Sequence, residues 1–132
     1  MNYTVHKAFQ KDKQVLTSYI ENYETSGEDF GNQDRNSLKL YNLNGLTINV
    51  KSFKIPNLVN QIAYRFFRKS KAQRSFEYAN RLLHLGIGTP KPIAFYEYKT
   101  PFLFKKSYYI SEHLPYDLTY RELTYNLTMA NH

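Results

Sequence analysis

The stretch that decides the fold runs from residue 37 to residue 51 and reads Ser37-Leu-Lys-Leu-Tyr-Asn-Leu-Asn-Gly-Leu-Thr-Ile-Asn-Val-Lys51. Polar and apolar residues alternate on both sides of Asn44-Gly45, which is the period of a strand with one buried face. Asn-Gly between two such runs favours a type I′ turn, because that turn needs a positive φ at both central residues. The sequence therefore predicts a β-hairpin with strands over 37–43 and 46–51.

The segments outside this hairpin predict further strands and helices. Apolar spacings of three and four indicate helices, and Gly or Pro marks the breaks between elements. In order, we expect a strand over 4–9, a helix over 11–24, a loop over 26–36, two helices within 58–85 that part near Lys69-Ser70, a strand pair over 93–98 and 102–111, and a last helix over 117–127. This order predicts one α+β domain over 1–132, with an antiparallel sheet of about five strands and helices packed on one side.

Composition removes several classes of protein. The chain of 132 residues has no Cys, which excludes disulfide scaffolds and Cys-based zinc sites. Its four His residues do not show the spacing of metal ligands, so we predict no metal site. No apolar run is long enough to span a membrane, and the first ten residues lack the core of a signal peptide. A cytoplasmic protein is the resulting expectation.

The net charge of +7 is concentrated in one stretch. Between Lys51 and Arg74 no acidic residue interrupts the basic ones, which are Lys51, Lys54, Arg65, Arg68, Lys69, Lys71 and Arg74. Such a surface favours an anionic partner, which can be a nucleotide, a phosphorylated glycolipid, a membrane surface or a nucleic acid. The alternative is a solvated helix face.

Lys51 and Glu77 are the two residues that could carry phosphate chemistry. Side chains alternate along a strand, so Lys51 lies on the face opposite Ile48 and Val50 and could bind phosphate as a point charge. The alternative is an edge-strand lysine that faces solvent. Glu77 is the first acid after the basic stretch, and it either forms an ordinary surface pair with Arg74 or Arg81 or reaches across to Lys51.

Four segments, in this order, resemble the Kdo/lipopolysaccharide kinase family. They are Asn49-Val-Lys-Ser-Phe-Lys-Ile-Pro-Asn57, Arg68-Lys-Ser-Lys-Ala-Gln-Arg-Ser-Phe-Glu-Tyr-Ala79, Leu85-Gly-Ile-Gly-Thr-Pro-Lys-Pro-Ile-Ala94 and Ser107-Tyr-Tyr-Ile-Ser111. The resemblance covers about residues 27 to 125. It implies the amino-terminal, ATP-binding lobe of a protein-kinase-like fold.

The resemblance also implies a role for individual residues. Lys51 falls at the third-strand lysine that binds the α- and β-phosphates of ATP, and Glu77 at the helix glutamate that pairs with it. The remaining assignments are Gly27, Gly31 and Arg35 in the loop that covers the phosphates, Ser111 at the gate of the pocket, and the backbone of Glu112 and Leu114 at the adenine edge.

The sequence departs from the family in three places. The loop over 27–36 is not G-x-G-x-x-G and carries three acids, and Asn49 replaces the small apolar residue that usually roofs the adenine. Nothing after Leu114 resembles the catalytic loop or the metal-binding Asp-Phe-Gly. Because transfer needs a base and a metal-holding acid, we expect no catalytic residue in this chain and no activity from it alone.

For an intact parent enzyme, the resemblance implies transfer of a phosphoryl group from ATP, with Mg²⁺, to a Kdo or heptose sugar of lipopolysaccharide. The stretch from Lys51 to Arg74 could then face the anionic glycolipid acceptor or touch the inner membrane as a peripheral contact. We also expect a homodimer through the exposed lobe face. Two non-enzymatic alternatives stay open: a pseudokinase-like interaction module, and a nucleic-acid-binding module with a tyrosine platform of Tyr41, Tyr96, Tyr98, Tyr108 and Tyr109.

Overall fold

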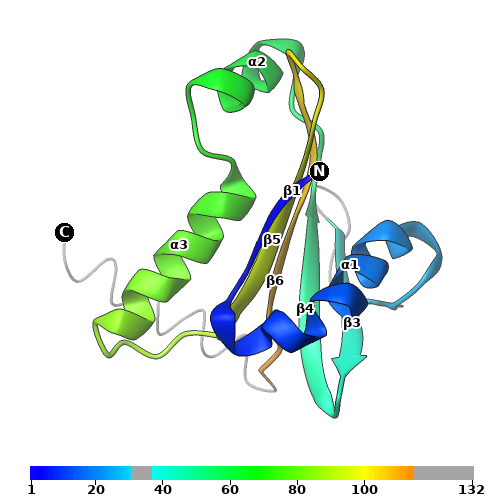
Figure 1. Cartoon of the computed structure of the whole chain (residues 1–132), viewed down its shortest axis with the longest axis vertical. Coiled ribbons are helices and arrows are strands. Elements are labelled where there is room, and N and C mark those ends of the chain that lie inside the picture. The colour runs from blue at the N-terminus through cyan, green and yellow to red at the C-terminus, as the bar shows by residue number, and fades with distance from the viewer. Residues whose placement is uncertain (31–36, 115–132) are drawn as a thin grey trace.

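The computed structural model describes residues 1–30 and 37–114. Within them, six strands form one antiparallel sheet in the order β1-β5-β6-β4-β3-β2 (Figure 1). The strands are β1 (Asn2–Val5), β2 (Glu28–Asp29), β3 (Ser37–Leu43), β4 (Leu46–Phe53), β5 (Pro92–Lys99) and β6 (Phe104–Glu112). The α-helices are α1 (Lys13–Glu21), α2 (Leu58–Phe66) and α3 (Lys71–His84), and the short 3-10 helices η1 (Lys7–Asp12) and η2 (Tyr23–Thr25) flank α1. The expected α+β class with an antiparallel sheet is confirmed.

The predicted hairpin is formed by β3 and β4. Asn44 and Gly45 both have positive φ, at 53° and 91°, as a type I′ turn requires. The side-chain oxygen of Asn42 accepts a hydrogen bond from the Gly45 N–H at 3.0 Å and closes the turn. The strand pair over 93–98 and 102–111 is likewise confirmed as β5 and β6.

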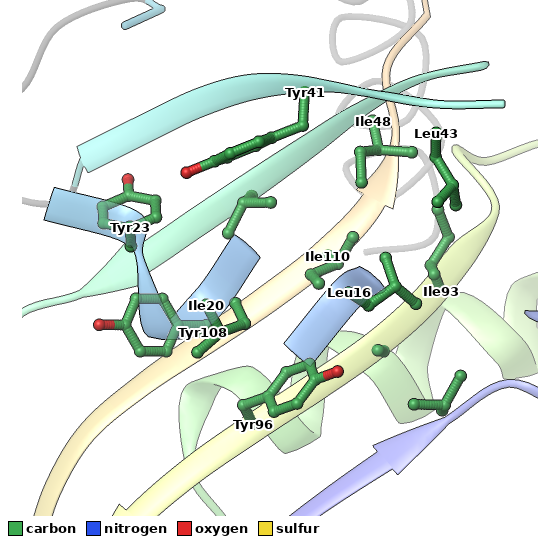
Figure 2. Close-up of a cluster of buried hydrophobic side chains, with 13 residues drawn as sticks. Leu16, Ile20, Tyr23, Tyr41, Leu43, Ile48, Ile93, Tyr96, Tyr108 and Ile110 are labelled. Atoms are coloured by element: carbon green, nitrogen blue, oxygen red, sulfur yellow. The ribbon is translucent and has the colours of Figure 1, made fainter. Parts of the chain in front are cut away.

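Helices cover both faces of the sheet, which corrects the expectation that they pack on one side. On one face, Leu16 and Ile20 of α1 pack against alternate strand residues such as Ile48 (Figure 2). On the other face, Ala72 and Phe76 of α3 pack against Phe53 and Phe95. The reason is that both alternating sets of the central strands are partly apolar, so each face needs a cover.

The tyrosine platform suggested for nucleic acid is not formed. Tyr41, Tyr96 and Tyr108 lie in the buried cluster beneath α1, where Tyr96 has no exposed surface (Figure 2). The Tyr96 hydroxyl lies 3.1 Å from the Thr17 hydroxyl, which satisfies it inside the protein. Tyr98 and Tyr109 are half-buried and pack against opposite clusters, so these rings cannot present one stacking surface to bases.

The predicted break between two helices falls between α2 and α3. Ser70 accepts a hydrogen bond from the Gln73 N–H at 3.0 Å, and Asn57 accepts one from the Asn60 N–H at 2.9 Å, so each helix begins at a side-chain cap. Three bounds differ from expectation. The first strand ends at Val5, the first helix shortens to α1, and the expected loop over 26–36 contains β2, a sixth strand whose two residues carry no apolar pattern.

The predicted helix over 117–127 lies outside the described residues. Among the helices that the structure does describe, none combines the length and the apolar character needed to span a membrane.

Candidate functional site

Lys51 lies on the face of the sheet that α3 covers. Its cross-strand neighbours are Leu38 in β3 and Tyr109 in β6, and directly paired residues of antiparallel strands share a face. The Lys51 ammonium lies 5.1 Å from the centre of the Phe53 ring. The predicted division of β4, with Lys51 opposite the buried Ile48 and Val50, is confirmed.

A cavity of about 560 Å³ opens between Lys51 and α3. Its lining consists of Lys51, Phe53, Lys71, Arg74, Ser75, Glu77, Tyr78 and Arg81. Four of these side chains are basic and one is acidic, so the cavity favours an anion. The two residues singled out in the sequence, Lys51 and Glu77, thus line one cavity although they belong to a strand and a helix far apart in the chain.

The Glu77 carboxylate is held by its own helix and by the residue that precedes the helix cap. Lys69 Nζ donates to Oε1 at 2.7 Å, and Gln73 Nε2 donates to Oε2 at 2.9 Å. These two hydrogen bonds, that from Lys69 above all, lower the pKa of Glu77. Glu77 therefore carries its charge at neutral pH, and its pairing with Lys51 stays a prediction.

The end of β6 is fixed by backbone hydrogen bonds. The Glu112 N–H donates to the Lys91 carbonyl at 2.9 Å, and the His113 N–H donates to the Thr47 carbonyl at 3.0 Å. Ser111 pairs with Asn49 across the strands, so both lie on the same face as Lys51. The structure thus brings Ser111, Glu112 and Asn49 to the end of the sheet where β6 terminates.

Gly27 has a packing role in the structure. Its φ is +76°, and a Cβ added there would lie 2.6 Å from Cζ of Tyr41. The residue is glycine because the Tyr41 ring occupies the space of a side chain. Its role over the phosphates stays a prediction, and Gly31 and Arg35 lie outside the described residues.

Sequence reasoning missed several residues around Lys51. Leu38 and Leu40 of β3 pair with Lys51 and Asn49, so they give the same face a half-buried apolar strip. The alternation of β3 was visible, but only the register with β4 shows which set joins Lys51. Phe53, Ser75 and Tyr78 were also missed as cavity residues, because their position depends on how α3 crosses the sheet.

Comparison with known proteins shows one distant likeness in fold. No family model matches the chain, and no curated protein matches it. Among solved structures, it is similar to WaaP in complex with acyl carrier protein, with 14% identity and a TM-score of 0.56. The match covers 87% of this chain and 42% of that chain, so the chain spans less than half of its length. The likeness shows the fold, which is that of a kinase-like amino-terminal lobe.

Proposed function

We propose that this chain, with its kinase-like fold, is the ATP-binding lobe of a small-molecule kinase that phosphorylates a Kdo or heptose sugar of the lipopolysaccharide core. The observation that carries the proposal is the basic cavity between β4 and α3, which Lys51 and Glu77 line together. A cationic cavity with a strand lysine at its wall suits the phosphates of a nucleotide. The distant likeness to WaaP supports the same class.

The strand order supports the assignment of Lys51. If β2 is counted as the first strand of the lobe, Lys51 lies on the third strand, β4, and Glu112 ends the fifth, β6. These are the positions that the family resemblance gave to the phosphate-binding lysine and to the strand before the adenine edge. In this counting β1 is an additional strand at the far edge of the sheet.

The proposed roles follow from what each group already binds. Lys51 would hold the α- and β-phosphates, and Glu77 would orient it after sharing or leaving its contact with Lys69. The Glu112 N–H already donates a hydrogen bond to the Lys91 carbonyl. The Glu112 carbonyl, together with the backbone of Leu114, would therefore meet the adenine. Leu40 and Asn49 would lie against the ring, since they share the face of Lys51.

Mg²⁺ would enter with ATP rather than through a site among the described residues. Glu77 is the acid among the described residues of the cavity lining, and Lys69 and Gln73 hold its carboxylate. We therefore assign the Mg²⁺ ligands to the phosphates of ATP and to acidic residues of a catalytic lobe, which would also supply the base. On this proposal the chain alone binds nucleotide and transfers nothing.

The remaining expectations belong to the intact enzyme. The acceptor would be an anionic glycolipid at the cytoplasmic face of the inner membrane, which the basic stretch from Lys51 to Arg74 complements in charge. An exposed lobe face would favour homodimers when the chain stands alone.

Calorimetry with Mg-ATP tests the proposal. We expect the chain to bind Mg-ATP and Lys51→Ala to weaken binding by about tenfold or more, because a phosphate loses a charge-assisted contact. Lys11→Ala is the matched control, since it removes the same charge from an exposed position on η1, away from the cavity. Equal affinity in both variants, or no binding even in a longer chain with a catalytic lobe, would leave a pseudokinase-like interaction module.

A further inference from the structure

Helix α2 turns its apolar side chains outward. Leu58, Val59, Ile62 and Phe66 lie on the exposed surface of this helix, with 76% of Val59 accessible, while Gln61 is buried. A helix that faces water normally buries its apolar stripe and exposes its polar residues. The orientation of α2 is the reverse of this, so its outward face is suited to a partner that is not water.

Neighbouring residues extend the apolar face into one surface at the end of the sheet. Figure 1 shows α2 beside the turn between β5 and β6, and Arg65 Nε ties the two together by donating to the Thr100 carbonyl at 2.9 Å. Tyr64 packs on Phe104, with 5.8 Å between ring centres. We call the resulting surface the α2 tip, and its exposed members are Ile55, Leu58, Val59, Ile62, Phe66, Phe67 and Phe102.

Basic residues lie beside the α2 tip. No acid occurs between Lys51 and Glu77, nor between Tyr98 and Ser111 on the other side of the surface. Arg65 and Arg68 lie over the rings of Phe66 and Tyr64, at 5.1 and 5.2 Å from the ring centres. Glu97, the acid closest in sequence to this turn, is buried and pairs with Lys99 at 3.4 Å. An apolar surface flanked by arginines complements an anionic lipid surface.

The last strand of the described chain also ends away from the tip. β6 begins beside α2 and ends at Glu112, at the opposite end of the sheet (Figure 1). Leu114, the last described residue, therefore also lies toward the end of the sheet remote from α2. By contrast, α3 begins shortly after α2 ends and carries the exposed Leu83 and Leu85 at its other end.

We infer that the α2 tip docks on an anionic lipid bilayer. Its apolar side chains would enter the boundary between headgroups and acyl chains, and the surrounding Lys and Arg side chains would reach the lipid phosphates. Helix α2 would lie in the plane of the surface, as amphipathic interfacial helices do. The inference stands apart from nucleotide binding, because the described lining of the Lys51 cavity includes none of the seven tip residues.

Co-sedimentation with vesicles tests the inference. We expect the chain to bind vesicles of phosphatidylglycerol and phosphatidylcholine and to bind pure phosphatidylcholine far more weakly. The double variant Val59→Asp with Phe67→Asp should bind the anionic vesicles at least about tenfold more weakly, because charges replace inserted apolar groups. Val15→Asp with Leu85→Asp is the matched control, since it adds the same two negative charges at exposed apolar positions outside the tip. It should weaken binding only by the repulsion between these charges and the anionic lipid, which both double variants have in common.

Fluorescence separates insertion from attraction by charge alone. The chain has no Trp, so Phe67→Trp places a single reporter in the tip and Leu85→Trp places one outside it. Emission should shift to the blue on anionic vesicles for the first variant and stay unchanged for the second. Binding without a shift at residue 67, or undiminished binding by the Val59/Phe67 double variant, would overturn the inference.

Two further readouts separate lipid docking from self-association and from nucleotide binding. A dimer of the parent chain that becomes monomeric in the Val59/Phe67 variant, together with no binding to vesicles, would show that a second copy covers the tip and would overturn the inference. Mg-ATP calorimetry on the same variant should match the parent, since these residues lie outside the cavity. A failure of lipid binding and a failure of nucleotide binding are thereby distinguishable.

Discussion

Gly27 illustrates how a glycine next to a proposed ligand site can serve the core. It stands at φ +76°, and the Tyr41 ring lies where a Cβ would project. Tyr41 is itself anchored, because its ring stacks on Tyr19 at 4.5 Å and its hydroxyl lies 3.0 Å from the Ser26 hydroxyl. A side chain at residue 27 would thus displace a ring that is held from two sides.

Gly27→Ala should lower the free energy of unfolding by about 2–5 kcal/mol, the sum of left-handed backbone strain and overpacking against Tyr41. Urea denaturation measures this change. Gly86→Ala is the control, since its φ of 79° is nearly the same but nothing lies within 4 Å of the added Cβ. It should cost only the backbone strain, about 1–2 kcal/mol. Equal losses in the two variants would contradict the contact with Tyr41.

At the scale of elements, α2 and α3 have similar caps but different packing. Ser70 is buried at the start of α3, whose residues Ala72 and Phe76 pack on the sheet. Asn57 is exposed at the start of α2, whose apolar face points to solvent. The two helices should therefore respond differently when a cap is removed.

Ser70→Ala should lower the global free energy of unfolding by about 1 kcal/mol or somewhat more, since α3 unfolds together with the core. Asn57→Ala should instead mainly increase hydrogen exchange within α2, because local opening of this helix exposes little that the core needs. Urea denaturation and amide exchange measure the two effects. A loss of global stability as large for Asn57→Ala as for Ser70→Ala would mean that α2 belongs to the cooperative core.

At the scale of the whole molecule, buried tyrosines couple the fold to alkaline pH. Burial raises the pKa of Tyr23 and of Tyr108 (Figure 2) from 10.0 to about 12. It also raises the pKa of Tyr109, which packs on the other face of the sheet. A pKa that is higher in the folded state contributes stability that is fully present below the unfolded value of 10.0. This contribution is lost as the pH rises from about 10 toward 12.

We therefore expect cooperative unfolding at alkaline pH, with tyrosinate absorbance and circular dichroism changing together. Tyr108→Phe should move the midpoint of this transition to higher pH, because it keeps the buried ring and removes the group that must ionise. Tyr3→Phe, at an exposed position, is the control and should leave the midpoint in place. Tyrosinate absorbance that completes its rise while the circular dichroism stays native would contradict the linkage.

Much of the local structure could be predicted from the chain. Asn44-Gly45 between alternating runs predicted the β3–β4 hairpin, and the same alternation placed Lys51 opposite Ile48 and Val50. The break between the two helices was expected near Lys69-Ser70, and Ser70 caps α3 there. These features depend on short-range chemistry, in which turn geometry, the period of a strand and a side-chain cap act within a few residues.

The sequence by itself thus determined the α+β class, the hairpin, the order of the described elements apart from β2, and the face of β4 that carries Lys51. Only the tertiary structure decided that α1 and α3 cover opposite faces of the sheet and that tyrosines lie in the core. It also decided that Lys69 holds Glu77 in a cavity shared with Lys51, and that α2 turns its apolar residues outward. The physical reason is that local patterns fix which residues share a face. Which face meets which partner depends on strand register and helix packing between residues far apart in the chain.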